Sequence, residues 1–229
     1  MDIEILTEDS SGQRLLEHLI PKLIGPLGEP HSWRFHAYRG VGRIPKGLLA
    51  SADPSKGILL DQLPRLLRGY VNTHGIDAVV VVLDTDARDC VAFLTELRSI
   101  AASCGASDTV LFRLDIEEIE AGYLGDPAAL QRAYPKARMR ALDQYMRDSI
   151  CGTWDLVAEA LHPGGSLAIR RAGWPLPGQI KHEWADRIGP MLDPEINLSP
   201  SFGKLRDGIR RLVTRLPPNY SAPFRRAGH

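Results

Sequence analysis

Acidic side chains follow three of the four short apolar runs in the first half of the chain. They are Glu8 after residues 3–7, Asp84 and Asp86 after residues 78–83, and Asp115 after residues 110–114. Carboxylates gathered in one place repel one another unless a cation lies between them. Mg²⁺ and Mn²⁺ prefer oxygen ligands, and Mg²⁺ keeps several waters, so two or three acids are enough to hold one ion. The pattern therefore predicts a divalent-metal site.

Asp84 and Asp86 flank a threonine at the end of the most apolar run. If the chain stays extended there, both aspartates lie on the same side and could reach one ion together with Glu8. Each acid also has a structural alternative, because a D-x-D sequence can cap a helix and Glu8 could interact with the dipole of the next helix. The combination of the three in this order favours metal binding, with Glu8, Asp84 and Asp86 as catalytic ligands of a first ion.

Further charged residues could complete the site. Glu117 and Glu120 lie three apart and share a face of the helix expected after residue 115, so they are predicted ligands of a second ion. The alternative is that they form a solvated acidic face. Glu118 is assigned to the surface. Lys181 is predicted to be a catalytic residue that clamps the charge of a phosphate; the alternative is an ordinary surface lysine.

The elements that must position these residues alternate between strand and helix. Apolar residues recur at helical spacing between the short runs. The second of these runs, residues 33–38, alternates as a strand does, and the Val-rich run 78–83 is typical of a central strand buried on both faces. The first ~125 residues thus predict β-α-β-α-β-α-β-α, an α/β fold with a parallel four-stranded, Rossmann-like sheet flanked by helices. Ligands of such sheets bind beyond the carboxyl ends of the strands, where the acids lie.

The second half of the chain predicts helices joined by loops. The expected helices cover residues 127–134, 138–147, 153–161, 179–191 and 201–216. We expect an α/β core over residues 1–125, a helical subdomain over 126–216 packed on the core, and a loose tail over 217–229. The last helix is basic, and its contacts to a nucleic-acid backbone are predicted for Lys204, Arg206, Arg210 and Arg211. The alternative is a solvated basic helix.

The composition is that of a globular protein and excludes several classes. Of 229 residues, 44% are hydrophobic and 24% are charged, and the formal net charge is zero, so bulk charge predicts no polyanion binding. Gly-rich phosphate loops and the G-x-S-x-G motif are absent, and the three scattered cysteines favour neither disulfides nor structural zinc. No apolar run could span a membrane and the first residues are acidic, so we expect a cytoplasmic protein without membrane association.

The order of these features resembles the TOPRIM domain of topoisomerases, bacterial primases and nucleases of the overcoming-lysogenization-defect type. In that domain a strand ending in Glu, a helix, a strand and a helix precede an apolar strand ending in D-x-D. Glu8 and the sequence Asp84-Thr85-Asp86 match this pattern, and the likeness covers residues 1–125. More narrowly, the chain is similar to a TOPRIM-related bacterial family of unknown function. That likeness is carried by residues 5–10, 84–89, 116–126 and 178–181.

The resemblance implies a nuclease that hydrolyses phosphodiester bonds with Mg²⁺ or Mn²⁺. Members of the narrower family are often encoded beside ATPases in mobile or defence-like loci, which implies a partner ATPase and a role in phage defence. No nucleophilic tyrosine can be assigned, so cleavage and religation are not expected. Two alternatives stay open: a non-catalytic TOPRIM-like module that binds a partner, and a metal-dependent phosphatase of the haloacid-dehalogenase type, whose D-x-D would lie on an earlier strand.

Overall fold

The computed structural model describes residues 1–43, 57–115, 118–149 and 151–215. Its centre is a sheet of four parallel strands in the order β2-β1-β3-β4. The strands are β1 (Asp2–Thr7), β2 (Ser32–Ala37), β3 (Ala78–Asp84) and β4 (Val110–Asp115). The sheet confirms the predicted α/β, Rossmann-like class, and the four strands lie at the predicted apolar runs.

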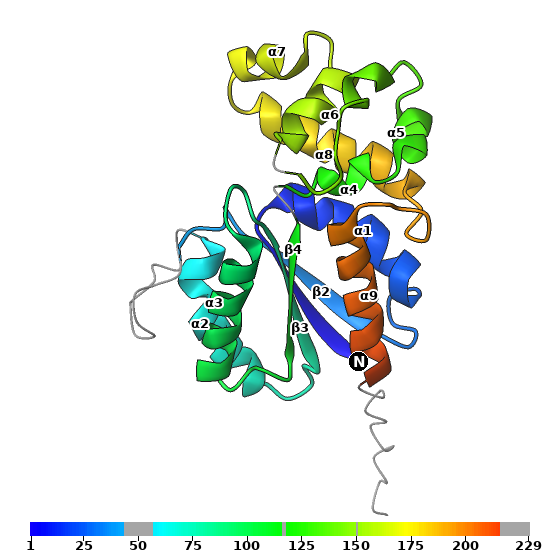
Figure 1. The fold of residues 1–229 in the computed structure, drawn as a ribbon. Coiled ribbons are helices and arrows are strands. Elements are labelled where there is room, and N and C mark those ends of the chain that lie inside the picture. Colours follow the sequence, from blue (N-terminus) through cyan, green and yellow to red (C-terminus); the bar gives the residue numbers. More distant parts are fainter. Residues whose placement is uncertain (44–56, 116–117, 150, 216–229) are drawn as a thin grey trace, which may run out of the picture.

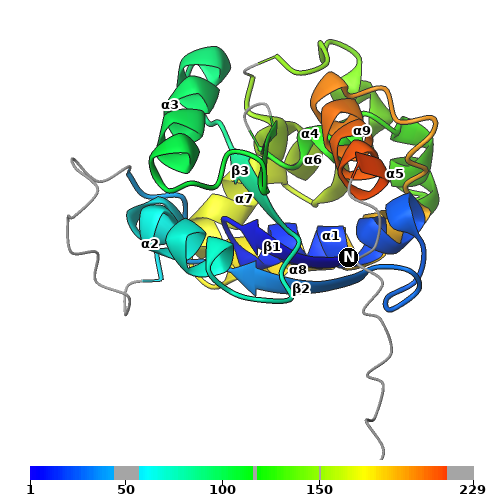
Figure 2. The ribbon, with the colours of Figure 1, turned by 90° about the horizontal axis from the view of Figure 1, so that it is seen from below.

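Helices cover both faces of the sheet (Figures 1 and 2). One face packs against α2 (Leu59–Val71) and α3 (Cys90–Ser103), and the other against α1 (Ser10–Ile24) and α9 (Pro200–Arg215). Strand β3 is buried on both faces, as its unbroken run of apolar residues predicts. Aspartates cap two of these helices: Asp9 accepts a hydrogen bond from Gly12 N at 2.7 Å, and Asp89 one from Ala92 N at 2.7 Å.

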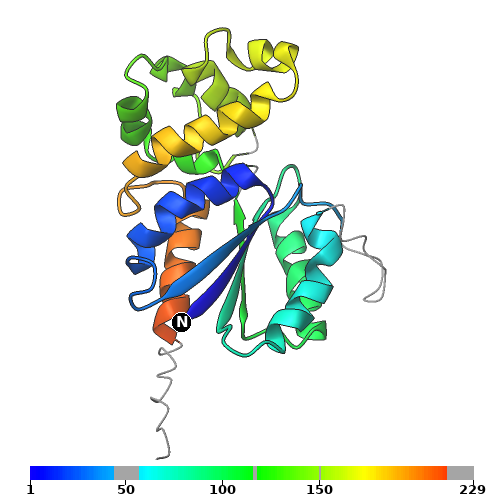
Figure 3. The same cartoon turned by 180° about the vertical axis from the view of Figure 1, so that it is seen from behind.

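The remaining helices form a layer across the carboxyl ends of the strands (Figures 1 and 3). They are α4 (Ala121–Leu124), α5 (Pro127–Ala133), α6 (Thr153–Leu161), α7 (Gly165–Ala172) and α8 (Leu176–Ile188), with short 3-10 turns at Met139–Leu142 and Gly189–Met191. The helix predicted over residues 138–147 is wrong, since only one 3-10 turn forms there. Helix α7 was not predicted, because glycines and a proline flank it closely on both sides.

Helix α9 returns from the helical layer to the sheet and packs against β4 (Figure 1). One apolar core therefore runs from the α1 face of the sheet, through Phe202 on α9, into the helical layer, where it includes Trp154 and Trp184. The helical half is continuous with the sheet through this core. In the described part of the chain, no helix is long and apolar enough to cross a membrane.

Candidate metal centre

The predicted acids on β1 and β3 meet at the carboxyl edge of the sheet, beneath the helical layer. Strands β1 and β3 are neighbours, and Asp84 at the end of β3 pairs in register with Asp115 at the end of β4. Glu8 follows β1 directly, and its Oε2 accepts a hydrogen bond from the backbone N–H of Asp84 at 3.3 Å. Parallel strands thus bring residues 8, 84 and 115 together although they are far apart in the sequence.

A fourth carboxylate, Glu120, joins them from the N-terminus of α4. Glu120 is 1% exposed and Asp115 is 4% exposed. We call Glu8, Asp84, Asp115 and Glu120 the carboxylate cluster. The sequence indicates Asp115 only as one of the acids after a strand; its burial marks it as a member of the site.

Burial and charge repulsion raise the pKa values of Glu8, Asp84 and Asp115. Burial, together with the charge of Asp86, raises the pKa of Glu8 to about 7. Burial raises the pKa of Asp84 well above its usual value, and the charges of Glu8, Asp115 and Glu120 add to this. The pKa of Asp115 rises to about 7, first through burial and then through the charges of Asp148 and Glu120. The ionised cluster is thus destabilised and would be stabilised by a cation.

Two buried oxygens of the carboxylate cluster are suited to such a cation. Asp115 Oδ2 and Glu120 Oε2 have no hydrogen-bond partner among the described residues. On the other side of the cluster, a cavity of about 10 Å³ is lined by Glu8 and Asp84, with Gly12 and Ile119, and not by Asp115 or Glu120. That volume corresponds to about one water-sized particle. Oxygen donors, negative charge and space for a small particle all fit Mg²⁺ or Mn²⁺.

The carboxylate cluster is not preorganised as a metal-coordination site. Among the described residues, no three histidine, cysteine, aspartate or glutamate side chains are grouped closely enough to hold a metal ion. Side chains of the cluster would therefore have to move closer together on binding. The residues fit a divalent cation by chemistry and charge.

Asp86 does not lie beside Asp84 in the way that an extended chain would place it. The backbone turns directly after Thr85, and Asp86 adopts a φ of 50° in the left-handed region. Its carboxylate is exposed and lies 3.9 Å from Arg88 Nη2. The alternation argument for Asp84 and Asp86 is wrong for this reason. The charge of Asp86 still acts on Glu8, so its role as a ligand stays a prediction.

The predictions for Glu117 and Glu118, the other acids after β4, differ in outcome. Glu117 lies outside the described residues. Glu118 is not a free surface residue: its Oε2 accepts a hydrogen bond from the backbone N–H of Trp154 at 3.0 Å, at the start of α6. Glu118 thus connects the end of the sheet to the helical layer, and only the packing of these two parts reveals this.

Lys181 on α8 reaches into the carboxylate cluster from the helical layer. Its Nζ lies 3.3 Å from Glu120 Oε1 and 3.8 Å from Glu118 Oε1. Burial alone would lower the pKa of the Lys181 amine, but the charges of Glu120, Glu118 and Asp84 raise it above its usual value. The sequence prediction that Lys181 belongs to the site is consistent with this position. Here its charge is engaged by carboxylates.

Replacing Lys181 by methionine is expected to lower the free energy of unfolding by about 3 kcal/mol, because it leaves buried carboxylates without their positive partner. Added Mg²⁺ or Mn²⁺ should restore part of the loss by supplying the missing charge. Thermal denaturation with and without the ions measures both effects. The exposed Lys136, changed to methionine, is the matched control. Equal stability of the Lys181 and Lys136 variants would contradict the role given to Lys181.

The basic helix α9 is present, but part of its charge is neutralised. Arg206 Nε lies 2.7 Å from Asp207 Oδ1, and Arg210 pairs with Glu195. Lys204 and Arg211 are exposed and are the better placed of the four predicted contacts.

Arginines that the sequence analysis missed extend this positive surface towards β4. Arg113 lies between β4 and α9, where its buried Nε has no hydrogen-bond partner among the described residues. Burial, together with the charges of Arg211 and Arg98, lowers the pKa of Arg113 to about 10. Gly208 makes room for the guanidinium, since a Cβ there would lie only 1.9 Å from Arg113 Nη2. Such like charges would be stabilised by an anion.

Comparisons with protein-family models, with curated proteins and with solved structures find no match to this chain. A function must therefore be inferred from the residues and their geometry.

Proposed function

We propose that the chain is a divalent-metal-dependent nuclease with a TOPRIM-like core, hydrolysing phosphodiester bonds in nucleic acid. The observation that carries this proposal is the carboxylate cluster at the carboxyl edge of the sheet. Its acids come from neighbouring parallel strands and from α4, and two of its buried oxygens lack partners in the described residues. A charged cluster of this kind lowers stability, which is typical of a site retained for function.

Glu8, Asp84, Asp115 and Glu120 would hold the ion, with Asp86 as a further ligand. A bound Mg²⁺ or Mn²⁺ supplies positive charge for the phosphate and makes water more acidic. In the hydrolysis, water adds to phosphorus, the bond from phosphorus to the leaving oxygen breaks, and that oxygen takes up a proton. Lys181, already within 3.3 Å of Glu120, would neutralise charge on the phosphate once the cation shares its carboxylate partners.

Nucleic-acid binding is supported by the arginines beside the sheet. Lys204 and Arg211 on α9, with Arg98 and Arg113 next to β4, would contact the phosphate backbone through charge and without reading the sequence. A partner ATPase and a role in phage defence remain predictions from the TOPRIM resemblance. We further propose that the protein acts in the cytoplasm, where its three cysteines would stay reduced.

One observation favours a second function, a non-catalytic module that binds a partner. The amine of Lys181 already occupies a position beside Glu120 and Glu118, as an internal cation would. In this second proposal the cluster holds the helical layer on the sheet and binds no metal. The two proposals differ in what Mg²⁺ does to the protein.

The decisive experiment is a cleavage assay with supercoiled plasmid, single-stranded DNA and single-stranded RNA. Each is incubated with the full chain in Mg²⁺, Mn²⁺ or EDTA, at low and at moderate salt, because phosphate contacts weaken as salt rises. We expect cleavage of at least one substrate in Mg²⁺ or Mn²⁺, none in EDTA, and loss of cleavage in the Glu8→Gln protein. p-Nitrophenyl phosphate tests the phosphatase alternative in parallel.

The matched control is Glu96→Gln, which removes an exposed glutamate of α3 that is not a member of the carboxylate cluster. This control should cleave as the unchanged protein does. Cleavage that persists in EDTA, or that is equal in the two glutamine variants, would overturn the metal centre. No cleavage together with no effect of Mg²⁺ or Mn²⁺ on thermal stability would favour the binding module.

A further inference from the structure

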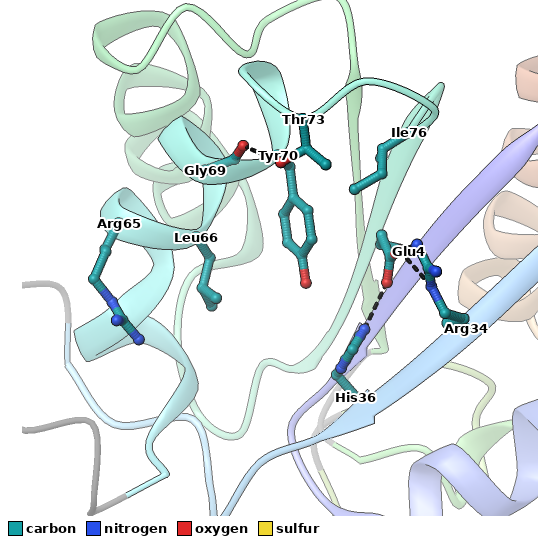
Figure 4. A pocket seen from close by; sticks show the side chains of 9 residues that line it. All are labelled: Glu4, Arg34, His36, Arg65, Leu66, Gly69, Tyr70, Thr73 and Ile76. Carbon is teal, nitrogen blue, oxygen red and sulfur yellow. Dashed lines mark hydrogen bonds and ion pairs between the residues drawn. The ribbon is translucent and has the colours of Figure 1, made fainter.

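A second polar pocket lies between β2 and α2, on the face of the sheet opposite α1 (Figure 4). Strand β2 is at the edge of the sheet, and its residues alternate between the two faces. Trp33 and Phe35 pack in the core beside α1, whereas Arg34 and His36 point towards α2. The hollow that they line with α2 measures about 510 Å³, within the range of small-molecule sites.

The floor of this pocket is a buried glutamate that positions two basic side chains. Glu4 is 3% exposed and lies on the face of β1 that also carries Leu6. Arg34 Nε donates to Glu4 Oε1 at 2.7 Å, and His36 Nε2 lies 2.6 Å from Glu4 Oε2. A buried carboxylate is costly without such partners. Glu4 therefore fixes the guanidinium and the imidazole in place, with the second ring nitrogen of His36 left for another partner.

Helix α2 supplies the opposite wall. Tyr70 reaches from α2 into the pocket towards the strands, and Arg65 lies one turn earlier on the same helix (Figure 4). Burial raises the pKa of Tyr70 to about 12, so its hydroxyl remains a hydrogen-bond donor. Leu66 and Ile76 add apolar surface. The pocket thus combines positive groups with an aromatic ring and an aliphatic wall.

The charges select the ligand. Arg34 and Arg65 outnumber Glu4, and His36 adds hydrogen-bonding capacity, so the pocket suits an anion. Guanidinium groups bind phosphate through paired N–H donors, while the ring of Tyr70 can stack on a flat group. We propose that this pocket binds a nucleotide, which carries both a phosphate monoester and an aromatic base. The nucleotide is either free or the 5′ end of a nucleic-acid strand. This site is separate from the carboxylate cluster and needs no metal.

Isothermal titration in EDTA tests the proposal with AMP, adenosine and inorganic phosphate as probes. We expect AMP to bind at least tenfold more tightly than adenosine or phosphate alone, since each of these carries only half of the recognised chemistry. A short oligonucleotide, with and without a 5′-phosphate, distinguishes a free nucleotide from the 5′ end of a strand as the ligand. Tighter binding of the phosphorylated form than of AMP identifies a strand end, and equal or weaker binding identifies the free nucleotide.

Arg65→Ala is the main test variant, because Arg65 is exposed and its loss leaves Glu4 paired. It should weaken AMP binding at least tenfold, whereas Arg68→Ala, one turn further along α2 and outside the pocket, should not. The Asp84→Asn protein should bind AMP normally, so the pocket and the nuclease can fail independently. Absence of AMP and oligonucleotide binding at millimolar concentration, or equal binding by the Arg65 and Arg68 variants, would overturn the proposal.

Discussion

Asparagine in place of Asp84 is expected to abolish metal-dependent cleavage while making the metal-free protein more stable. Asp84 lies among Glu8, Asp115 and Glu120, whose charges, after burial, raise its pKa. The neutral amide keeps the shape of the side chain but removes that repulsion. It also removes an anionic ligand, and several kcal/mol of lost transition-state stabilisation correspond to a decrease in rate of about a thousandfold.

Single-turnover cleavage and thermal denaturation in EDTA measure the two effects on the same protein. In a chain of this size, each kcal/mol of relieved repulsion raises the melting temperature by about 2–4 °C. Asp108→Asn is the control, since Asp108 is an exposed aspartate in the loop before β4. Retained cleavage in the Asp84 variant would remove Asp84 from the active site. Lower stability than the unchanged protein would show that its charge supports the fold.

The metal-free protein is expected to lose stability as the pH rises from about 4 to about 7. Burial raises the pKa of Asp115 from 3.8 to about 7, and burial likewise raises that of Glu8 from 4.5 to about 7. Between those values the folded chain binds more protons than the unfolded chain, so the free energy of unfolding falls with pH. For Asp115 the whole effect is on the order of 4 kcal/mol. Below pH 4 this contribution is fully favourable, and above pH 7 it is lost.

Urea denaturation at a series of pH values, in EDTA, measures how steeply the free energy of unfolding falls with pH. Asp115→Asn should make this fall less steep, because the amide does not titrate. Saturating Mg²⁺ or Mn²⁺ should also raise stability at pH 8, by about 2.7 kcal/mol at one hundred times the dissociation constant. Asp108→Asn should leave the pH profile unchanged. A profile that is flat between pH 4 and 7 would mean that the cluster is not buried in the way the structure places it.

These two experiments also separate the proposed functions. A nuclease site is destabilised without metal and stabilised with it. Removing the charge of Asp84 and binding the ion should therefore both raise the free energy of unfolding. A binding module that uses Lys181 as its internal cation would respond little to Mg²⁺, since the amine already lies 3.3 Å from Glu120. The response of the free energy of unfolding to Mg²⁺ therefore distinguishes the two before any substrate is known.

Local patterns were enough to predict the sheet and part of the candidate site. The Val-rich run of β3 and the alternation of β2 report which faces are buried, because side-chain direction follows the backbone with a period of two. Acids directly after parallel strands must lie at the same edge, which placed Glu8, Asp84 and Asp115 near one another. No pairing information was needed for either inference.

The sequence pattern failed where a backbone turn or a distant segment decides the outcome. Asp86 leaves the line of β3 because the chain turns at a φ of 50°, which alternation cannot anticipate. Glu118, which the sequence assigns to the surface, instead lies 3.8 Å from Lys181, because α8 packs over the carboxyl edge of the sheet.

The pocket beside β2 depends on tertiary structure in the same way. Glu4, Arg34 and Tyr70 come from three elements and become neighbours only when β2 pairs with β1 and α2 leaves part of their shared face open. Local periodicity therefore determined which residues form strands and where the acids emerge. The order of the strands and the helices that cover them decided which charges are buried together, because burial and Coulomb interactions depend on distance in space and not on distance along the chain.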